Sequence, residues 1–341
     1  MHDLARSVAE LAADLSLSGV VRIDLDGEDG IAHAFGWANR ALHVPNTVNT
    51  QFGIASGTKG FTAMTVIGLI ESGHLRLDTT ARSLLGDDLP LIDDRVTVEQ
   101  LLAHRSGIGD YFDEDVPYQP DDYMMPVPVH ELAATEHYVR VLDGHPAKFA
   151  PGKRFSYSNG GYVVLAILAE RAAAQPFHDL VGERVCRPAG LADTAFLRSD
   201  ELPGRAALGY LDDGLRTNVF HLPVRGSGDG GIYTTAADMH RWWAAFLAGR
   251  IVTDEHVALM THPTTGANAT GRAPLGYGLG LWLDAETGAI SVHGFDPGVG
   301  FVSARDPAGR YAFTVIVNTT RGAWPAHQRV ADLIAEHLGP A

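Results

Sequence analysis

Residues 57–70 form an apolar stretch that carries a single ionisable side chain, Lys59, and the next ionisable residue is Glu71. This stretch predicts a helix from about Gly57 to Ser72 that is apolar on every side, and a helix of this kind is buried. A buried ammonium group is costly unless it is hydrogen-bonded or loses its proton. The fold therefore has to enclose this helix and provide partners for Lys59, which is one of only three lysines in the chain.

Ser56 lies three residues before Lys59, one helical turn away on the same face. A serine hydroxyl beside a lysine that acts as a base is an activated nucleophile. The alternative is that Ser56 only caps the helix and that Lys59 extends its ammonium group to the surface. Two observations favour the nucleophile: the chain uses mainly arginine for its other cations, and no other serine is followed by lysine three residues later.

The composition restricts the class of protein and its partners. With 341 residues, 45% hydrophobic and 20% charged, the chain is typical of a globular protein of one large domain or two interlocked ones. A formal net charge of -15 without basic patches argues against nucleic acid or an anionic membrane surface as a partner. There is no stretch of eighteen apolar residues and no secretory signal, so we expect a cytoplasmic protein; a signal trimmed from the sequence would leave no trace.

Motifs for metals, cofactors and disulfides are missing from the sequence. Cys186 is the only cysteine, which forbids an intrachain disulfide and is typical of a small buried hydrophobe. No HExxH motif or Cys/His cluster predicts a metal site. The glycine-rich residues 226–231 lack the phosphate-loop pattern, so we interpret them as a sharp turn that lines a cleft. We expect a small-molecule substrate, no cofactor and no metal; the oligomeric state stays open.

The order of strand and helix signals indicates how the chain is divided. Strands are predicted at both ends, and the middle is predicted to be mainly helical, with a long surface loop at 110–129. The predicted terminal strands are 18–25, 31–38, 277–283, 289–293, 298–303 and 311–318, and the predicted helices include 129–142, 161–171, 235–247 and 325–338. This arrangement predicts one sheet domain formed by residues 1–75 and 225–341, with a helical domain, 76–224, inserted into it. Small ligands usually bind in clefts between such domains.

Two further segments carry candidate polar groups. Tyr157, Ser158 and Asn159 follow a Pro-Gly turn and precede a helix, so Ser158 or Asn159 can be a simple N-cap, whereas a phenol can relay protons and an amide can orient a lysine. His293 ends an apolar strand and precedes Gly294, which lets a ligand approach the backbone closely. A lone histidine at a strand end is more often structural. His104 is interpreted as fixing a turn.

Taken in order, these segments resemble the three motifs of the penicillin-recognising serine hydrolases, and they look most like the branch of class C β-lactamases, D-amino-acid amidases and carboxylesterases. The motifs are Ser56-Gly57-Thr58-Lys59, Tyr157-Ser158-Asn159 and His293-Gly294. Residues 101–107, 149–162 and 230–238 are similar to three further family signatures. The resemblance covers nearly the whole chain. It implies an α/β (α+β) fold of the β-lactamase type, an antiparallel sheet flanked by helices with an inserted, mostly helical domain.

The resemblance also implies a role for each motif. Ser56 would attack a carbonyl carbon and carry the acyl group, and Lys59, held by Asn159, would take the serine proton. Tyr157 would pass protons to the leaving group, and whether Lys59 or Tyr157 is the true base is disputed for relatives. The oxyanion would lie between the backbone N–H of Ser56 and one on the strand after His293.

The third motif departs from the family pattern of Lys or His, a small residue and Gly. The sequence His293-Gly294-Phe295 puts Phe in the glycine place, whereas Val292-His293-Gly294 keeps the glycine and loses the basic first residue. The two registers point His293 to opposite faces of the strand. We favour His293 in the active site, and the second oxyanion donor is then Phe295 or Asp296.

A histidine that is largely neutral at pH 7 holds a substrate carboxylate poorly. Together with the missing export signal, this disfavours peptidoglycan and β-lactam antibiotics as substrates. We expect a serine hydrolase, esterase- or amidase-like, that cleaves an ester or amide bond of a small molecule through an acyl-enzyme on Ser56, with Lys59 or Tyr157 as the general base. The alternatives are a β-lactamase or D-amino-acid peptidase or amidase, an acyltransferase, and a non-catalytic homologue that binds a ligand in the same cleft.

Overall fold

The computed structural model describes residues 2–27, 30–211 and 214–338. Its centre is a seven-stranded sheet in the order β2-β1-β11-β10-β9-β8-β7, in which every neighbouring pair is antiparallel. The strands of this sheet are β1 (Gly19–Leu25), β2 (Ile31–Phe35), β7 (Leu275–Tyr277), β8 (Trp282–Asp284), β9 (Ile290–Asp296), β10 (Val299–Arg305) and β11 (Tyr311–Val317). Two small sheets pair β3 (Trp37–Asn39) with β4 (Val44–Pro45) and β5 (Phe52–Gly53) with β6 (Tyr233–Thr234).

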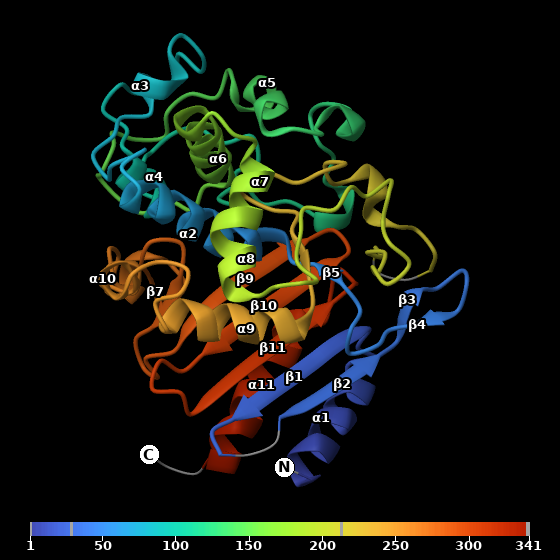
Figure 1. The fold of residues 1–341 in the computed structure, drawn as a ribbon. Coiled ribbons are helices and arrows are strands. Elements are labelled where there is room, and N and C mark those ends of the chain that lie inside the picture. The colour runs from blue at the N-terminus through green and yellow to red at the C-terminus, as the bar shows by residue number, and fades with distance from the viewer. Residues whose placement is uncertain (1, 28–29, 212–213, 339–341) are drawn as a thin grey trace.

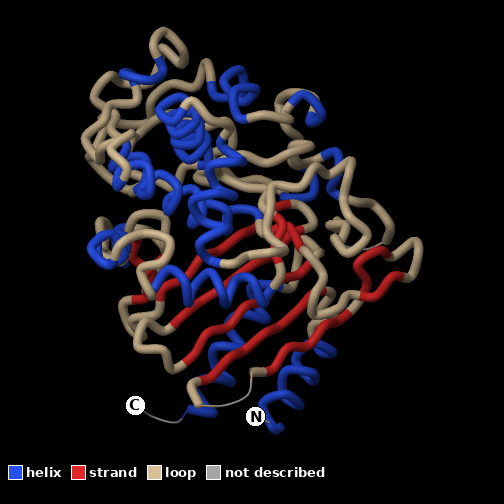
Figure 2. The backbone as a smooth tube through the Cα atoms, in the orientation of Figure 1, coloured by secondary structure: helices blue, strands red, loops and turns tan. Residues whose placement is uncertain are grey.

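Helices cover both faces of this sheet (Figures 1 and 2). On one face lie α1 (His2–Asp14) and α11 (Ala323–Leu338), and on the other lie α9 (Ala236–Leu247) and α2 (Thr58–Glu71). Alternate residues of each strand enter two different cores: Val20 faces the α2 and α9 side, whereas Val21 faces the α1 and α11 side. This antiparallel sheet with helices confirms the predicted β-lactamase-like α/β fold.

Most of the remaining helices lie between β5 and β6 in the sequence and form the upper part of the molecule in Figure 1, although the last of them, α8 (Arg187–Ala189), reaches down to α9. They are α3 (Arg82–Leu85), α4 (Val98–Leu102), α5 (Val139–Leu142), α6 (Asn159–Ala173), α7 (Phe177–Val181) and α8, and α10 (Asp254–Met260) follows α9. Short 3-10 turns lie at 55–57, 120–122, 129–131, 135–138, 218–220 and 267–269, and a π-helical turn lies at 182–186. The domain boundaries at 75/76 and 224/225 stay a prediction.

Helix α2 lies at the junction of these parts, and every residue from Thr58 to Leu69 is buried. It packs against α6 and against β9. Gly60 lets the helix approach the sheet, because a Cβ atom at this position would lie 2.9 Å from Val292 and 3.0 Å from Trp242. The prediction of a buried helix in this segment is confirmed.

Three secondary-structure predictions are wrong. The predicted strand 31–38 is two strands in different sheets, β2 and β3, separated by Gly36 with its φ of +68°. Residues 129–142 do not form one helix, because the carbonyls of Val129 and Leu132 accept hydrogen bonds from Val224 and Arg225 and are not available to a continuous helix. The predicted strand 277–283 is two strands, β7 and β8, joined by a tight turn that Gly280 allows with its φ of +86°. Among the described residues, no helix has both the length and the apolar character needed to cross a membrane.

Candidate active site

Ser56 sits in the 3-10 turn Ala55–Gly57 that leads directly into α2. The residue before it, Ala55, has a φ of +44°, a left-handed conformation that is strained for alanine. The turn is fixed by a hydrogen bond of 2.9 Å from the N–H of Gly57 to the carbonyl of Ile54. Within the described chain the N–H of Ser56 has no hydrogen-bond acceptor. The start of α2 therefore presents both the hydroxyl and a free backbone donor of Ser56 at one point.

Lys59 is only 2% exposed, and its Nζ makes three short contacts. They are 2.8 Å to Ser56 Oγ, 2.8 Å to Asn159 Oδ1 and 2.9 Å to the carbonyl oxygen of Asp229. A neutral amine has two N–H groups and one lone pair, which match the two carbonyl-type acceptors and the serine O–H. Burial lowers the pKa of Lys59, and the nearby carboxylates of Asp229 and Glu114 oppose this shift. The arrangement therefore satisfies Lys59 both as an ammonium and as a base toward Ser56.

The orientation of Asn159 is fixed from its other side. Its amide Nδ2 donates to the carbonyl of Phe112 at 3.1 Å and to Glu114 Oε1 at 3.2 Å, which leaves Oδ1 toward Lys59. Asn159 is the first residue of α6, and Ser158 caps that helix by accepting a hydrogen bond of 3.0 Å from the N–H of Gly161. The N-cap is Ser158, and Asn159 is free to hold the lysine.

Tyr157 lies between two aromatic side chains. Its ring centroid is 4.3 Å from that of His104 and 5.9 Å from that of Trp282, and Lys59 Nζ lies 5.0 Å from the centre of the ring. Burial raises the pKa of Tyr157, so its phenol is neutral. His104 accepts a hydrogen bond of 3.0 Å at Nδ1 from the N–H of Ser158. Through this hydrogen bond His104 holds the backbone next to Tyr157, in addition to the turn that it was predicted to fix.

On β9, Val292 and Gly294 share the face that meets α2 and the serine turn. A Cβ atom on Gly294 would lie 2.0 Å from the carbonyl oxygen of Ile54, so this residue occupies the place where only glycine fits beside the serine turn. His293 points to the other face of β9, where its Nε2 lies 2.9 Å from Ser291 Oγ and its ring stacks on Trp282. Burial lowers the pKa of His293 well below its ordinary value, which makes the ring neutral at pH 7.

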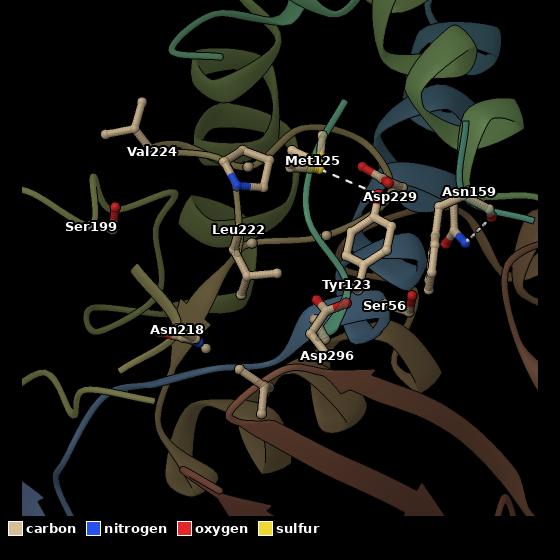
Figure 3. Close-up of a pocket in the computed structure, with 18 of the residues that line it drawn as sticks. Ser56, Tyr123, Met125, Asn159, Ser199, Asn218, Leu222, Val224, Asp229 and Asp296 are labelled. Atoms are coloured by element: carbon tan, nitrogen blue, oxygen red, sulfur yellow. Dashed lines mark hydrogen bonds between the residues drawn. The ribbon is translucent and has the colours of Figure 1, made fainter. Parts of the chain in front are cut away.

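Two cavities meet at Ser56. The larger has a volume of about 840 Å³ and extends past Asn159, Asp229 and Asp296 toward the segment 218–224 (Figure 3). The smaller, of about 320 Å³, is lined by Ser56 together with Tyr157, His293, Gly294 and Phe295. The structure thus brings Ser56, Lys59, Tyr157 and Asn159 together and places His293 and Phe295 in the wall of the smaller cavity.

Asp229, Arg272 and Glu114 lie at the site but were not singled out from the sequence. Asp229 supplies the third acceptor of Lys59 through its backbone, for which the sequence carries no signal beyond the predicted turn at 226–231. Arg272 lies with its guanidinium 5.5 Å from the centre of the Tyr157 ring and pairs with Glu114 at 3.1 Å. These residues come from loops, whose position depends on the whole fold. Over the described residues, no group of three or more His, Cys, Asp or Glu is arranged to hold a metal ion.

Comparison with known proteins gives the same assignment over the whole chain. Residues 4–337 match the family model described as Beta-lactamase. The chain belongs to the β-lactamase family. It is 24% identical over 325 residues to the putative penicillin-binding protein PbpX of Bacillus subtilis, covering 94% of this chain and 75% of that protein. It is 30% identical over 282 residues to the D-aminopeptidase of Brucella anthropi, covering 81% of this chain.

The crystal structure of a penicillin-binding protein from Bacillus halodurans superposes with a TM-score of 0.89, at 32% identity, covering 96% of this chain and 99% of that one. The chain spans about half the length of the D-aminopeptidase relative, since the match covers 50% of that protein. The resemblance of the sequence to the penicillin-recognising hydrolases is thereby confirmed at the level of the family.

Proposed function

We propose that this member of the β-lactamase family is a serine hydrolase that cleaves an ester or amide bond of a small molecule through an acyl-enzyme on Ser56. The observation that carries the proposal is the 2.8 Å contact between Lys59 Nζ and Ser56 Oγ inside a buried site where both other contacts of the amine are accepted by carbonyl oxygens. A base in contact with a serine hydroxyl is the arrangement that nucleophilic catalysis needs.

In the proposed first half-reaction, the Ser56 proton moves to the lone pair of Lys59 while Oγ attacks the carbonyl carbon of the substrate. The developing oxyanion is stabilised by the unpaired N–H of Ser56 and by that of Phe295 or Asp296 on β9. When the bond to the leaving group breaks, the neutral phenol of Tyr157 donates its proton to the departing oxygen or nitrogen and is reprotonated from the Lys59 ammonium. Because Tyr157 lines the smaller cavity, the leaving group lies there.

In the second half-reaction, water attacks the acyl carbon and its proton passes to the same base, which releases the acid and restores Ser56. The larger cavity, which Ser56 also lines, holds the acyl group throughout. Asn159 acts by keeping Lys59 in place.

The relative of 30% identity is called a D-aminopeptidase, which supports amides and peptides of D-amino acids as the second class of substrate to test. Transfer of the acyl group to an alcohol or amine in place of water uses the same intermediate. A panel of nitrophenyl esters, D-amino-acid amides and β-lactams, each with and without an added alcohol acceptor, separates these activities.

The intermediate itself is tested by mass spectrometry. A fluorophosphonate should add to wild-type protein at Ser56, and Ser56→Ala should remove both the adduct and ester hydrolysis. Ser83→Ala is the matched control, because Ser83 is exposed and bonds only the carbonyl of Thr80. Wild-type protein that forms no adduct and leaves the whole panel intact would overturn the proposal in favour of a ligand-binding homologue.

A further inference from the structure

The larger cavity beside Ser56 has an apolar, aromatic wall and two carboxylates. Figure 3 shows Asp229 and Asp296 at the end of the cavity where Ser56 lies, with Leu222 and Val224 toward the other end. The aromatic members of the wall are Tyr111, Phe112, Tyr123, Tyr138 and Tyr233. No lysine, arginine or histidine lines this cavity in the described structure. Its charged groups are therefore all acidic.

Neither carboxylate is neutralised by a contact with a basic side chain. Asp296 has no hydrogen-bond or ion-pair partner for its side chain in the described part of the chain, and Asp229, which is 9% exposed, accepts a hydrogen bond from the hydroxyl of Tyr111. Lys59 is close, but its three contacts go to a hydroxyl, an amide oxygen and a backbone carbonyl. Arg272, the cation of the other cavity, pairs with Glu114.

Such an arrangement is costly without a ligand. Burial and the neighbouring Asp229 raise the pKa of Asp296 to about 8, and burial also raises that of Asp229. A cation between the two groups would remove this cost, and aromatic walls favour a cation over an anion. The wall thus carries two carboxylates, and no basic side chain of the described protein contacts either of them.

We propose that the larger cavity selects a substrate whose acyl group carries a protonated amine, with Asp296 and Asp229 as the counter-ions of that amine. The assignment to the acyl group rests on the proposed function, in which Tyr157 places the leaving group in the smaller cavity. The substrate class is then an aminoacyl amide, ester or short peptide with a free amino group. An ammonium bound there also repels the charge on Lys59, so substrate binding favours the neutral form of the catalytic base.

The amine site is tested first by binding, without turnover. In a Ser56→Ala background, calorimetry compares cyclohexylmethylamine with cyclohexylmethanol, which is nearly isosteric and uncharged. We expect the amine to bind about 30-fold more tightly, the factor typical of a charge-assisted hydrogen bond in a buried site. Its affinity should rise with pH toward the pKa of Asp296, about 8, while that of the alcohol stays constant. Equal affinities would overturn the proposal.

Substitutions then locate the effect. Asp296→Asn should remove most of the preference for the amine, and Asp229→Asn, which keeps an acceptor for Tyr111, serves as a second variant if the first is misfolded by circular dichroism. Asp143→Asn is the matched control on the exposed surface. A preference that persists in both cavity variants assigns the amine to another site and refutes the proposed counter-ions.

Turnover separates this inference from the proposed function. The ratio of kcat/KM for D- or L-alanine p-nitroanilide to that for propionyl p-nitroanilide should be high in wild-type protein and collapse in Asp296→Asn. Hydrolysis of all three anilides with equal efficiency supports the serine hydrolase and refutes the amine site. Amine binding to Ser56→Ala with no hydrolysis by wild-type protein supports the amine site and refutes the hydrolase.

Discussion

Replacing Gly294 by alanine tests the contact that joins the last part of the sheet to the nucleophile. The new Cβ atom would lie 2.0 Å from the carbonyl oxygen of Ile54 and 3.1 Å from the amide nitrogen of Gly57. Ordinary van der Waals contact begins at 3.4 Å, so β9 and the serine turn have to separate by about 1.4 Å. Both neighbours are backbone atoms of an already strained turn, and neither can move aside by a simple rotation.

The expected cost is about 2 kcal/mol of unfolding free energy, as for other overpacked sites. A displacement of this size between Ser56 and the oxyanion donor on β9 should lower kcat/KM for a nitrophenyl ester about 100-fold. Gly182→Ala is the matched control, because its Cβ atom meets no atom within 4 Å and the residue lies in a helical turn. This control should be neutral or more stable by about 0.5 to 1 kcal/mol.

Urea unfolding and ester hydrolysis measured on the same two proteins decide the outcome. Wild-type activity and stability in Gly294→Ala would refute the reasoning, since the contact with Ile54 would then not position the serine turn. Loss of activity with unchanged stability would also contradict the overpacking argument. Phe295→Gly adds a test of the register, because gain of activity on introducing glycine there would indicate that Phe295 stands in the glycine place of the motif.

Three further predictions concern the base, the acid and the helix cap. Burial lowers the pKa of Lys59 in the folded protein below its ordinary 10.5, so between these two pKa values the unfolded chain binds more protons than the folded one. The unfolding free energy of wild-type protein should therefore rise with pH relative to that of the inactive variant Lys59→Met. Urea unfolding that gives both proteins the same pH dependence would contradict the lowered pKa. The pKa of Asp296 is raised from 3.8 to about 8 in the folded protein, so the unfolding free energy of wild-type protein should fall as pH rises between these values. In the same assay, Asp296→Asn should stabilise the protein by a few kcal/mol more at pH 8 than at pH 4. Equal stabilisation at both pH values would exclude a raised pKa. Ser158→Ala removes the N-cap of α6 and should lower the stability measured by thermal unfolding by about 1 kcal/mol. It should also lower kcat, because Asn159, the first residue of α6, then holds Lys59 less firmly. Unchanged stability would show that the cap is dispensable.

The sequence predicted those features that depend on local spacing. An apolar run with one cation is enough to predict a buried helix, and two side chains one turn apart in a helix must be neighbours, which places Ser56 at Lys59. The order of the motifs brought Tyr157 and Asn159 into the same hypothesis, and the structure has both beside Lys59. Alternating apolar residues likewise predicted β1, β9, β10 and β11 closely.

Features that depend on distant backbone groups were not predictable in this way. A carbonyl oxygen such as that of Asp229 carries no side-chain signal, so its contact with Lys59 could not be foreseen. The helix expected at 129–142 failed because a remote loop at 224–225 competes for its carbonyls, and tertiary hydrogen bonds override local propensity. The direction of His293 required the position of Ile54, which only the folded chain defines.

The sheet order has a consequence for how the protein acquires activity during synthesis. Strand β1 pairs with β11, and the turn that carries Ser56 is backed by β9, so the nucleophile and the strand beside it are made far apart in time. Pairings between such distant segments require a long loop to close and make folding slow. The helical middle of the chain emerges from the ribosome well before β9, and no functional pocket exists until that strand arrives. Folding intermediates with an exposed β1 edge are then the species that chaperones would have to protect from aggregation.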